Sequence, residues 1–249
     1  MNNIILCEGS TDYQLLQYYM RKAHHWEEIP GVMQNNAFKY KNQNSRVLKK
    51  ENDTLTIAAV GGCSELAAGL EAVLTRNQWA APNISSDVTG KIVIVTDNDD
   101  VGTEQSIIGE VKSVLQNKQV TVKDEIRNNC WTNCSMAGQT ISQIDFELLL
   151  LIIPFSENGA MENFLLDAIS VKDPYDGGII HKCNNFVNTV DPDKKYLKQR
   201  RIITKAKFDT YFSVRTPLTQ FNERQSILKN VPWEDYEKVQ SGFLQLRRI

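Results

Sequence analysis

The sequence predicts an α/β fold in which a parallel β-sheet is flanked by helices. Three short apolar runs are each followed by a turn and then by apolar residues at helical spacing. Strand, turn and helix repeated in this order are typical of parallel sheets built from right-handed crossovers. The three predicted strands are Asn3–Cys7, Thr54–Val60 and Lys91–Val95.

Size and charge exclude several classes of protein. The 249 residues suffice for one large domain, or for a domain of about 120 to 150 residues with an extension. Lys and Arg number 28 against 30 Asp and Glu, so the net charge of −2 gives no global attraction to nucleic acid. The longest apolar run, Phe146–Phe155, is far shorter than the roughly 20 residues of a membrane helix. We therefore expect no membrane segment, and any nucleic-acid binding needs a local basic patch.

The cysteines indicate a reducing environment. There are five, an odd number without regular spacing, and we find no secretory leader, so we expect reduced thiols in a cytoplasmic protein. A zinc site formed by Cys130, Cys134, His181 and Cys183 is an alternative. Their spacing matches no standard zinc pattern.

Acidic residues follow the third predicted strand directly. Asp97, Asp99 and Asp100 therefore belong at its carboxyl end. Carboxylates so close together repel one another, and a hard divalent cation such as Mg²⁺ or Mn²⁺ removes the repulsion by taking their oxygens as ligands. Alternatively, Asp99 or Asp100 caps the helix expected to begin near Gly102, as Asp often does. The stretch predicts either a metal site or a helix cap.

Glu8 stands at a similar place, after the first predicted strand. Gly9 allows a tight turn there, and Ser10 or Thr11 can cap the helix that follows. Glu8 would then lie at the same edge of the sheet as Asp97. The alternative is that Glu8 is an exposed loop residue.

A glycine pair closes the second predicted strand. Gly61 and Gly62 would let the backbone approach a ligand closely, although such a pair is a weak sign of phosphate binding. The chain has no Walker sequence and no Gly-x-Gly-x-x-Gly after the first strand. Nucleotide-cofactor folds are therefore disfavoured.

Residues 24–53 show no sustained period and are rich in polar side chains, so we predict an insertion or a long exposed connection. Further on, Gln119–Val122 and Ile144–Ile153 are predicted strands, and Cys130–Cys134 is expected in a loop or hairpin.

Glu162 lies near the start of a predicted helix. It is a candidate ligand, or it favours the helix N-terminus electrostatically.

The C-terminal part contains an unusual run of basic residues. Residues 173–193 are rich in Asp, Asn, Gly and Pro and are expected to form a loop or a boundary to a helical subdomain. Seven basic residues then occur within fourteen positions that hold no acid, whereas charge runs on solvated helices normally mix signs. We predict a phosphate-binding strip, with a solvated helix or a partner interface as the alternative. This basic strip consists of Lys194, Lys195, Lys198, Arg200, Arg201, Lys205 and Lys207.

Three of these elements together resemble the Toprim domain of topoisomerases, bacterial primases and several nucleases. They are a Glu-Gly turn after the first strand, a Gly-Gly turn after the second and an Asp-x-Asp after the third. Residues 159–165 are similar to the acidic element of small standalone Toprim proteins related to the OLD-family nucleases. The elements read Glu8-Gly9, Gly61-Gly62, Asp97-Asn98-Asp99 and Gly159-Ala160-Met161-Glu162-Asn163-Phe164-Leu165.

The resemblance covers about the first 170 residues and implies specific roles. It implies a Rossmann-like Toprim domain over residues 1–170, with the insertion at 24–53, and a mainly helical extension over 171–249 packed on it. The implied metal ligands are Glu8, Asp97, Asp99 and Glu162, with Asp12 and Asp100 as supporting residues or alternative ligands. Lys205 or Lys207, only loosely similar to a lysine near those nuclease sites, would stabilise negative charge in the reaction.

The resemblance implies a Mg²⁺- or Mn²⁺-dependent nuclease that hydrolyses phosphodiester bonds of DNA or RNA. Nucleic acid would bind along Lys194, Lys195, Lys198, Arg200 and Arg201. Small proteins of this type resemble partners of separately encoded ATPases in antiphage defence, and this chain has no ATPase motif of its own. The alternative is a non-catalytic Toprim-like nucleic-acid sensor or regulatory subunit.

Overall fold

The computed structural model describes residues 1–29, 38–80, 88–217 and 228–249. These residues form two compact units. The first unit comprises Met1–Ile152 and Gln245–Ile249, and the second comprises Ile153–Leu244. These units are compact groups of residues and do not test the domain boundary expected at residue 170. That boundary stays a prediction.

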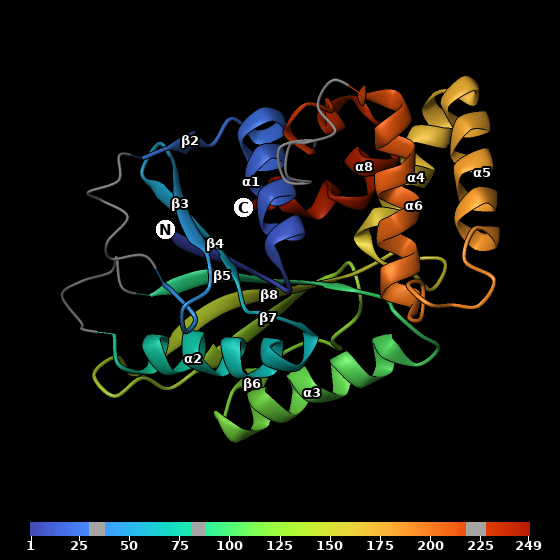
Figure 1. Ribbon diagram of the computed structural model, residues 1–249. Helices are drawn as coiled ribbons and strands as arrows, with labels where there is room; N and C mark the ends of the chain where they lie inside the picture. The colour runs from blue at the N-terminus through green and yellow to red at the C-terminus, as the bar shows by residue number, and fades with distance from the viewer. Residues whose placement is uncertain (30–37, 81–87, 218–227) are drawn as a thin grey trace. The chain divides into compact units, whose positions relative to one another are not determined.

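The described part of the first unit contains an eight-stranded sheet in the order β2-β3-β4-β1-β5-β8-β7-β6. Figure 1 shows α2 and α3 on one face of this sheet and α1 on the other. The strands are β1 (Asn2–Cys7), β2 (Glu27–Glu28), β3 (Ser45–Lys50), β4 (Asp53–Ala59), β5 (Thr89–Asp97), β6 (Thr121–Val122), β7 (Trp131–Met136) and β8 (Ile144–Ile153). The helices are α1 (Ser10–His24), α2 (Leu66–Gln78) and α3 (Thr103–Asn117), with a 3-10 turn, η2 (Cys63–Glu65), before α2.

The sheet is mixed, so the α/β class is confirmed but the expectation of a parallel sheet is correct only for its centre. β1 pairs in parallel with β4 and with β5. The outer pairs β2 with β3, β3 with β4, β6 with β7 and β7 with β8 are antiparallel. Only two residues separate β3 from β4. Such a short connection allows a hairpin but no parallel crossover.

The expectation of a long exposed connection at 24–53 is wrong in part, because its described residues include strands, while residues 30–37 lie outside the described residues. β3 lies within it and pairs along its whole length with β4. Only Val47 and Leu48 of this strand are buried, between charged neighbours. Two apolar residues are too few to give a visible period, which is why the sequence did not reveal the strand.

The parallel centre carries the core of the first unit. Ile4 and Leu6 of β1 pack into one cluster with Leu70 of α2 and Ile107 of α3. Ile5, which points to the opposite face, is also fully buried. Burial on both faces explains why β1 reads as an unbroken apolar run.

The second unit is helical: from residue 161 on, its described residues form helices and connections. Helix α4 packs against α5, α6 and α8, and α5 packs against α6. The unit's largest fully buried side chains are aromatic. Its helices are α4 (Met161–Lys172), α5 (Pro174–Thr189), α6 (Arg200–Arg215) and α8 (Glu237–Gly242), with a 3-10 turn, η5 (Trp233–Asp235), and η6 (Leu244–Arg248) runs from its last residue into the first unit.

The expected loop at 173–193 is wrong, because most of it forms α5. Asp173 caps this helix by accepting a hydrogen bond from the N–H of Tyr175 at 2.8 Å, and Pro174 occupies the first turn. An Asp cap followed by Pro is a helix start signal. Gly177, which lowers helix propensity, lies close to the backbone of Ser170, where a larger residue would be crowded.

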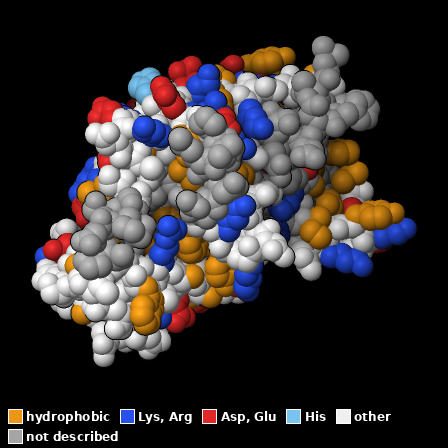
Figure 2. Space-filling view, turned by 90° about the vertical axis from the view of Figure 1, so that its left-hand side faces the viewer, with side chains coloured by type: hydrophobic (Ala, Val, Ile, Leu, Met, Phe, Trp, Pro, Cys, Tyr) orange, Lys and Arg blue, Asp and Glu red, His pale blue; other side chains and the backbone are white. Residues whose placement is uncertain are grey.

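Two findings bear on membranes and on charge. No helix in the described ranges is long and apolar enough to cross a membrane. Figure 2, which shows the left-hand side of the view in Figure 1, has basic and acidic side chains interspersed on that face. Any attraction for a polyanion there would have to come from a local group of cations.

Candidate functional site

The carboxyl ends of three parallel strands define the candidate site in the first unit. In the register of the sheet, Cys7 lies between Ala59 and Val95. Glu8 and the glycine pair at 61–62 therefore leave neighbouring strands at the same edge, where β5 ends in Asp97. This is the edge at which open parallel sheets bind ligands.

Glu8 joins the three strands by hydrogen bonds. Its Oε1 accepts a hydrogen bond from the Thr96 hydroxyl and another from the backbone N–H of Asp97, the latter at 2.9 Å. Its backbone carbonyl accepts one from the N–H of Gly61, also at 2.9 Å. Within the described residues, Oε2 of Glu8 accepts no hydrogen bond. Glu8 is thus held in place through one carboxylate oxygen and is not a freely moving loop residue.

The acids after β5 do not cap the next helix. Helix α3 has Gly102 as its N-cap residue, and no side-chain hydrogen bond caps it. Thr103 instead accepts a hydrogen bond from the N–H of Asp100 through its Oγ1 at 2.9 Å. Asp97 is half-buried and Asp99 is exposed. The helix-cap alternative is therefore wrong for Asp99 and Asp100.

Asp12, by contrast, serves the start of a helix. Its Oδ2 accepts a hydrogen bond from the N–H of Gly9, the N-cap residue of α1, at 3.2 Å. The backbone of Gly9 is extended, with φ −138°, so no glycine-specific turn occurs there. The predicted side-chain caps, Ser10 and Thr11, do not cap α1. The carboxylate of Asp12 is buried beside the candidate site but is already engaged.

Both residues of the glycine pair have backbone conformations that favour glycine. Gly61 has φ +98° and Gly62 has φ +138°, conformations that L side chains rarely adopt. A Cβ on Gly61 would also lie 2.9 Å from Nε2 of Gln43. The expected glycine turn after the second predicted strand is confirmed.

Two further residues of this edge were not predicted. Thr96, almost fully buried, orients Glu8, and its hydroxyl oxygen lies 3.8 Å from Sγ of Cys63. Burial raises the pKa of the Cys63 thiol, and the negative charges of Glu8 and Asp99 add to the effect. The thiol is therefore neutral near pH 7. The only sequence signals were position: Thr96 precedes Asp97, and Cys63 follows the glycine pair.

Several predicted site residues belong to the second unit. Glu162 lies in the first turn of α4 and is only 4% exposed. Lys205 and Lys207 are half-buried on α6. The first unit therefore gathers Glu8, Asp12, Asp97 and Asp99 at one edge, whereas Glu162 and the two lysines are residues of the helical unit.

The basic strip is not a single helix. Its first part precedes α6, and its second part begins the helix with Arg200 and Arg201, both exposed. Asp191 organises the first part, because its carboxylate accepts hydrogen bonds from the N–H groups of Lys195, Tyr196 and Leu197 at 3.0, 2.7 and 2.8 Å. These bonds, above all the one from Leu197, lower the pKa of Asp191. The backbone of residues 195–197 is thereby held in place, while Lys194, Lys195 and Lys198 stay exposed.

The donor atoms at the edge suit a hard cation. Among the residues that the structure describes, no three His, Cys, Asp or Glu side chains are already grouped as metal ligands. That result gives the zinc alternative no support. Mg²⁺, however, is usually held by one or two carboxylates together with water and substrate phosphates, not by a full protein cage. Glu8 and Asp97 fit that requirement by their chemistry.

Comparison with known proteins identifies the family. Residues 2–241 match the family described as protein of unknown function DUF3226. The chain belongs to this family. No curated protein matches it.

Solved structures add information on the fold alone. The crystal structure of the hypothetical protein PH0156 from Pyrococcus horikoshii OT3 is similar, with a TM-score of 0.50 and 17% identity over 99% of this chain and 98% of that chain. The DUF3226 chain therefore shares that fold. A lactoylglutathione lyase from Agrobacterium tumefaciens matches 59% of this chain and 91% of its own at 11% identity, but the TM-score of 0.17 carries no argument.

Proposed function

We propose that this protein is a Toprim-like, metal-dependent nuclease that hydrolyses phosphodiester bonds of DNA or RNA. One observation carries the proposal. The Glu8 carboxylate is fixed against the end of β5 by Thr96 and by the N–H of Asp97, at the ligand-binding edge of three parallel strands. Hydrogen bonds of this kind orient carboxylates that serve as metal ligands, and here they fix the direction of the remaining oxygen, Oε2.

We assign a separate role to each of the residues in this proposal. Oε2 of Glu8 and the carboxylates of Asp97 and Asp99 would hold Mg²⁺ or Mn²⁺, and Asp12 would position the turn after β1. When bound, the ion would activate water and offset charge on the scissile phosphate. The resemblance assigns stabilisation of negative charge on the phosphate to Lys205 or Lys207, which are residues of the second unit.

The decisive test is the substitution Asp97→Asn, which keeps size and removes charge. We expect it to abolish Mg²⁺-dependent cleavage of a mixed panel of single- and double-stranded DNA and RNA, because the metal loses a charged ligand. Asp145→Asn is the matched control, since Asp145 is an exposed acid on β8. A folded Asp97→Asn protein that cleaves as fast as the control would refute the assignment.

A second candidate is a nucleic-acid sensor or regulatory subunit without turnover. It is favoured by the exposed Arg200 and Arg201 at the start of α6, because such cations bind phosphates without any reaction taking place. Calorimetric titration with Mg²⁺ and Mn²⁺ beside the cleavage panel separates the two functions. Metal binding without cleavage, even after a separately encoded ATPase partner is added, would select the sensor. Both functions are compatible with antiphage defence in the cytoplasm.

A further inference from the structure

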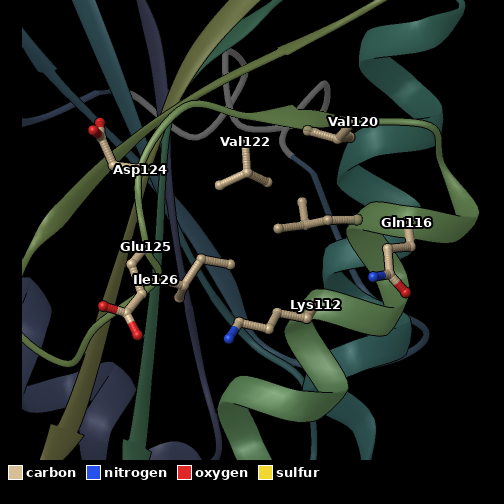
Figure 3. Close-up of a pocket in the computed structure, with 8 residues that line it drawn as sticks. Lys112, Gln116, Val120, Val122, Asp124, Glu125 and Ile126 are labelled. Carbon is tan, nitrogen blue, oxygen red and sulfur yellow. The ribbon is translucent and has the colours of Figure 1, made fainter.

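A pocket of about 240 Å³ lies in the first unit, away from the candidate site (Figure 3). It is formed by the C-terminal half of α3, by β6 and by the residues that follow β6. Helix α3 begins at the acidic edge with Thr103, and Lys112 of the pocket is nine residues further on. At 1.5 Å per residue this places the pocket about 14 Å along the helix from that edge.

The interior of the pocket is aliphatic. Leu115 of α3, Val120, Val122 of β6 and Ile126 line it. Leu115 and Ile126 are buried, and the two valines are half-buried. Figure 3 shows Val122 and Ile126 directed into the space between the helix and the strand. Such a surface favours a branched or linear hydrocarbon group.

The rim carries both signs of charge. Lys112 stands on the helix side, and Asp124 and Glu125 stand on the strand side. Lys112 makes no ion pair with any described residue. Glu125 is paired with Arg127 at 2.8 Å, and Asp124 accepts a hydrogen bond from Nδ2 of Asn133 at 3.5 Å. These contacts use only Oε2 of Glu125 and Oδ2 of Asp124, so among the described residues the second oxygen of each carboxylate accepts no hydrogen bond. The ammonium of Lys112 and one of these oxygens can therefore both contact a ligand.

We propose that this pocket binds a small aliphatic zwitterion, namely an α-amino acid with a branched hydrocarbon side chain such as leucine. The side chain would occupy the aliphatic interior, the carboxylate would contact Lys112, and the ammonium group would contact Asp124 or Glu125. The volume of about 240 Å³ is sufficient for the four carbon atoms of the leucine side chain, because a single water molecule needs only roughly 10 to 15 Å³ of space measured in the same way. This site does not depend on the proposed nuclease function.

The test uses three ligands of similar size with the full-length protein. Leucine carries both charges, 4-methylpentanoate lacks the ammonium group, and 3-methylbutylamine lacks the carboxylate. Binding is followed by NMR of methyl-labelled protein. We expect leucine to shift the methyl resonances of Leu115, Val122 and Ile126 saturably, and each analogue to bind about tenfold more weakly, as is usual when a hydrogen bond to a charged group is removed.

Variants on the rim assign the contacts. Lys112→Ala should weaken leucine binding about tenfold while leaving the affinity for 3-methylbutylamine unchanged, because the amine has no carboxylate for Lys112 to bind. Asp124→Asn combined with Glu125→Gln should weaken leucine but not 4-methylpentanoate. Lys123→Ala is the matched control, since Lys123 is an exposed lysine beside the pocket that does not line it. Absence of saturable shifts with leucine, or equal binding of leucine and both analogues, would overturn the proposal.

Discussion

At the level of single residues, the Thr96 hydroxyl determines how the Glu8 carboxylate is oriented. Thr96 is 2% exposed and donates to Oε1, the oxygen that also receives the N–H of Asp97. The hydroxyl therefore stabilises a charged group that the sheet brings to its edge. Its contribution can be measured without metal or substrate.

We predict that Thr96→Val lowers the free energy of unfolding by about 1 to 3 kcal/mol, because a buried hydrogen bond to a charged group is removed while the shape is kept. Urea unfolding at pH 7 measures this. A double-mutant cycle with Glu8→Gln isolates the pair. If Thr96→Val cost the same with Glu8 as with Gln at position 8, the hydroxyl would not act through that carboxylate.

The sequence predicted the acids of the site but not what holds them. Glu8, Asp97 and Asp99 are recognisable because each follows an apolar strand directly. Thr96 gives no such signal, since threonine is common in strands for its β-branched shape. Which strand lies beside which is a property of the sheet, and only that pairing brings Thr96 to Glu8.

At the level of elements, the turns at the acidic edge differ in their need for glycine. Gly61 has φ +98° and little space for a Cβ, whereas Gly9 is extended and a Cβ there would have no other atom within 4 Å. Both glycines belong to the sequence pattern that resembles Toprim domains. The structure assigns backbone strain to one of them only.

We predict that Gly61→Ala lowers the free energy of unfolding by roughly 1 to 2 kcal/mol, because an L residue is strained at that φ. Gly9→Ala is the matched control. It should leave stability unchanged or raise it by up to about 1 kcal/mol, since alanine reduces the entropy of the unfolded chain. Chemical unfolding of both variants under the same conditions gives the comparison, and equal losses of stability would contradict the backbone assignment.

The end of α1 makes a second prediction possible, because His24 is half-buried there and packs edge-on against Tyr19. Burial, and next the positive charges of Arg247, Lys50 and His25, lower its pKa to about 4. The unfolded chain, with a histidine pKa of about 6.5, binds more protons than the folded chain between these values. Stability is therefore complete above about pH 6.5 and is lost as the pH falls towards 4.

We expect His24 to contribute about 1 to 2 kcal/mol to this loss, after allowance for the screening of a partly exposed ring. Urea unfolding at pH 7 and pH 5 should show a smaller difference for His24→Gln than for the unchanged protein. His181→Gln is the control, because His181 is exposed on α5. Identical pH dependence in His24→Gln would show that another group causes it.

Element types were predicted best where the apolar pattern was long. The strand Ile144–Ile153 was predicted with its observed bounds, and the three parallel strands were found within a few residues. β3 and α5 were missed for physical reasons that differ. β3 buries only two side chains, and α5 contains two adjacent glycines that lower helix propensity, so tertiary packing decides its conformation.

At the level of the whole chain, the last five residues return to the first unit. The carbonyl of Gln245 accepts a hydrogen bond from Nε1 of Trp131 at 3.2 Å, and Arg248 pairs with Glu147. The guanidinium of Arg248 also lies 5.2 Å from the centre of the Trp131 ring and makes a cation–π contact with it. These contacts are internal to the first unit, which the chain leaves after Ile152 and re-enters at Gln245. No local sequence pattern indicates that a chain end pairs with a strand more than a hundred residues away.

The net charge of −2 means that nucleic-acid binding would depend on local cations, and the basic strip is the candidate. We predict that reversing Lys198, Arg200 and Arg201 to Glu weakens binding of every sequence tested. Binding to phosphates releases counterions, so the slope of log affinity against log salt should flatten by about 0.7 to 0.9 for each phosphate that is no longer neutralised. Fluorescence anisotropy with DNA and RNA oligomers at several salt concentrations measures both quantities.

The matched control reverses three exposed lysines of the first unit, Lys22, Lys49 and Lys123, and so changes the net charge equally. An equal effect of both triple reversals would show that only net charge matters, and unchanged affinity and slope in the strip variant would show that the strip does not contact nucleic acid.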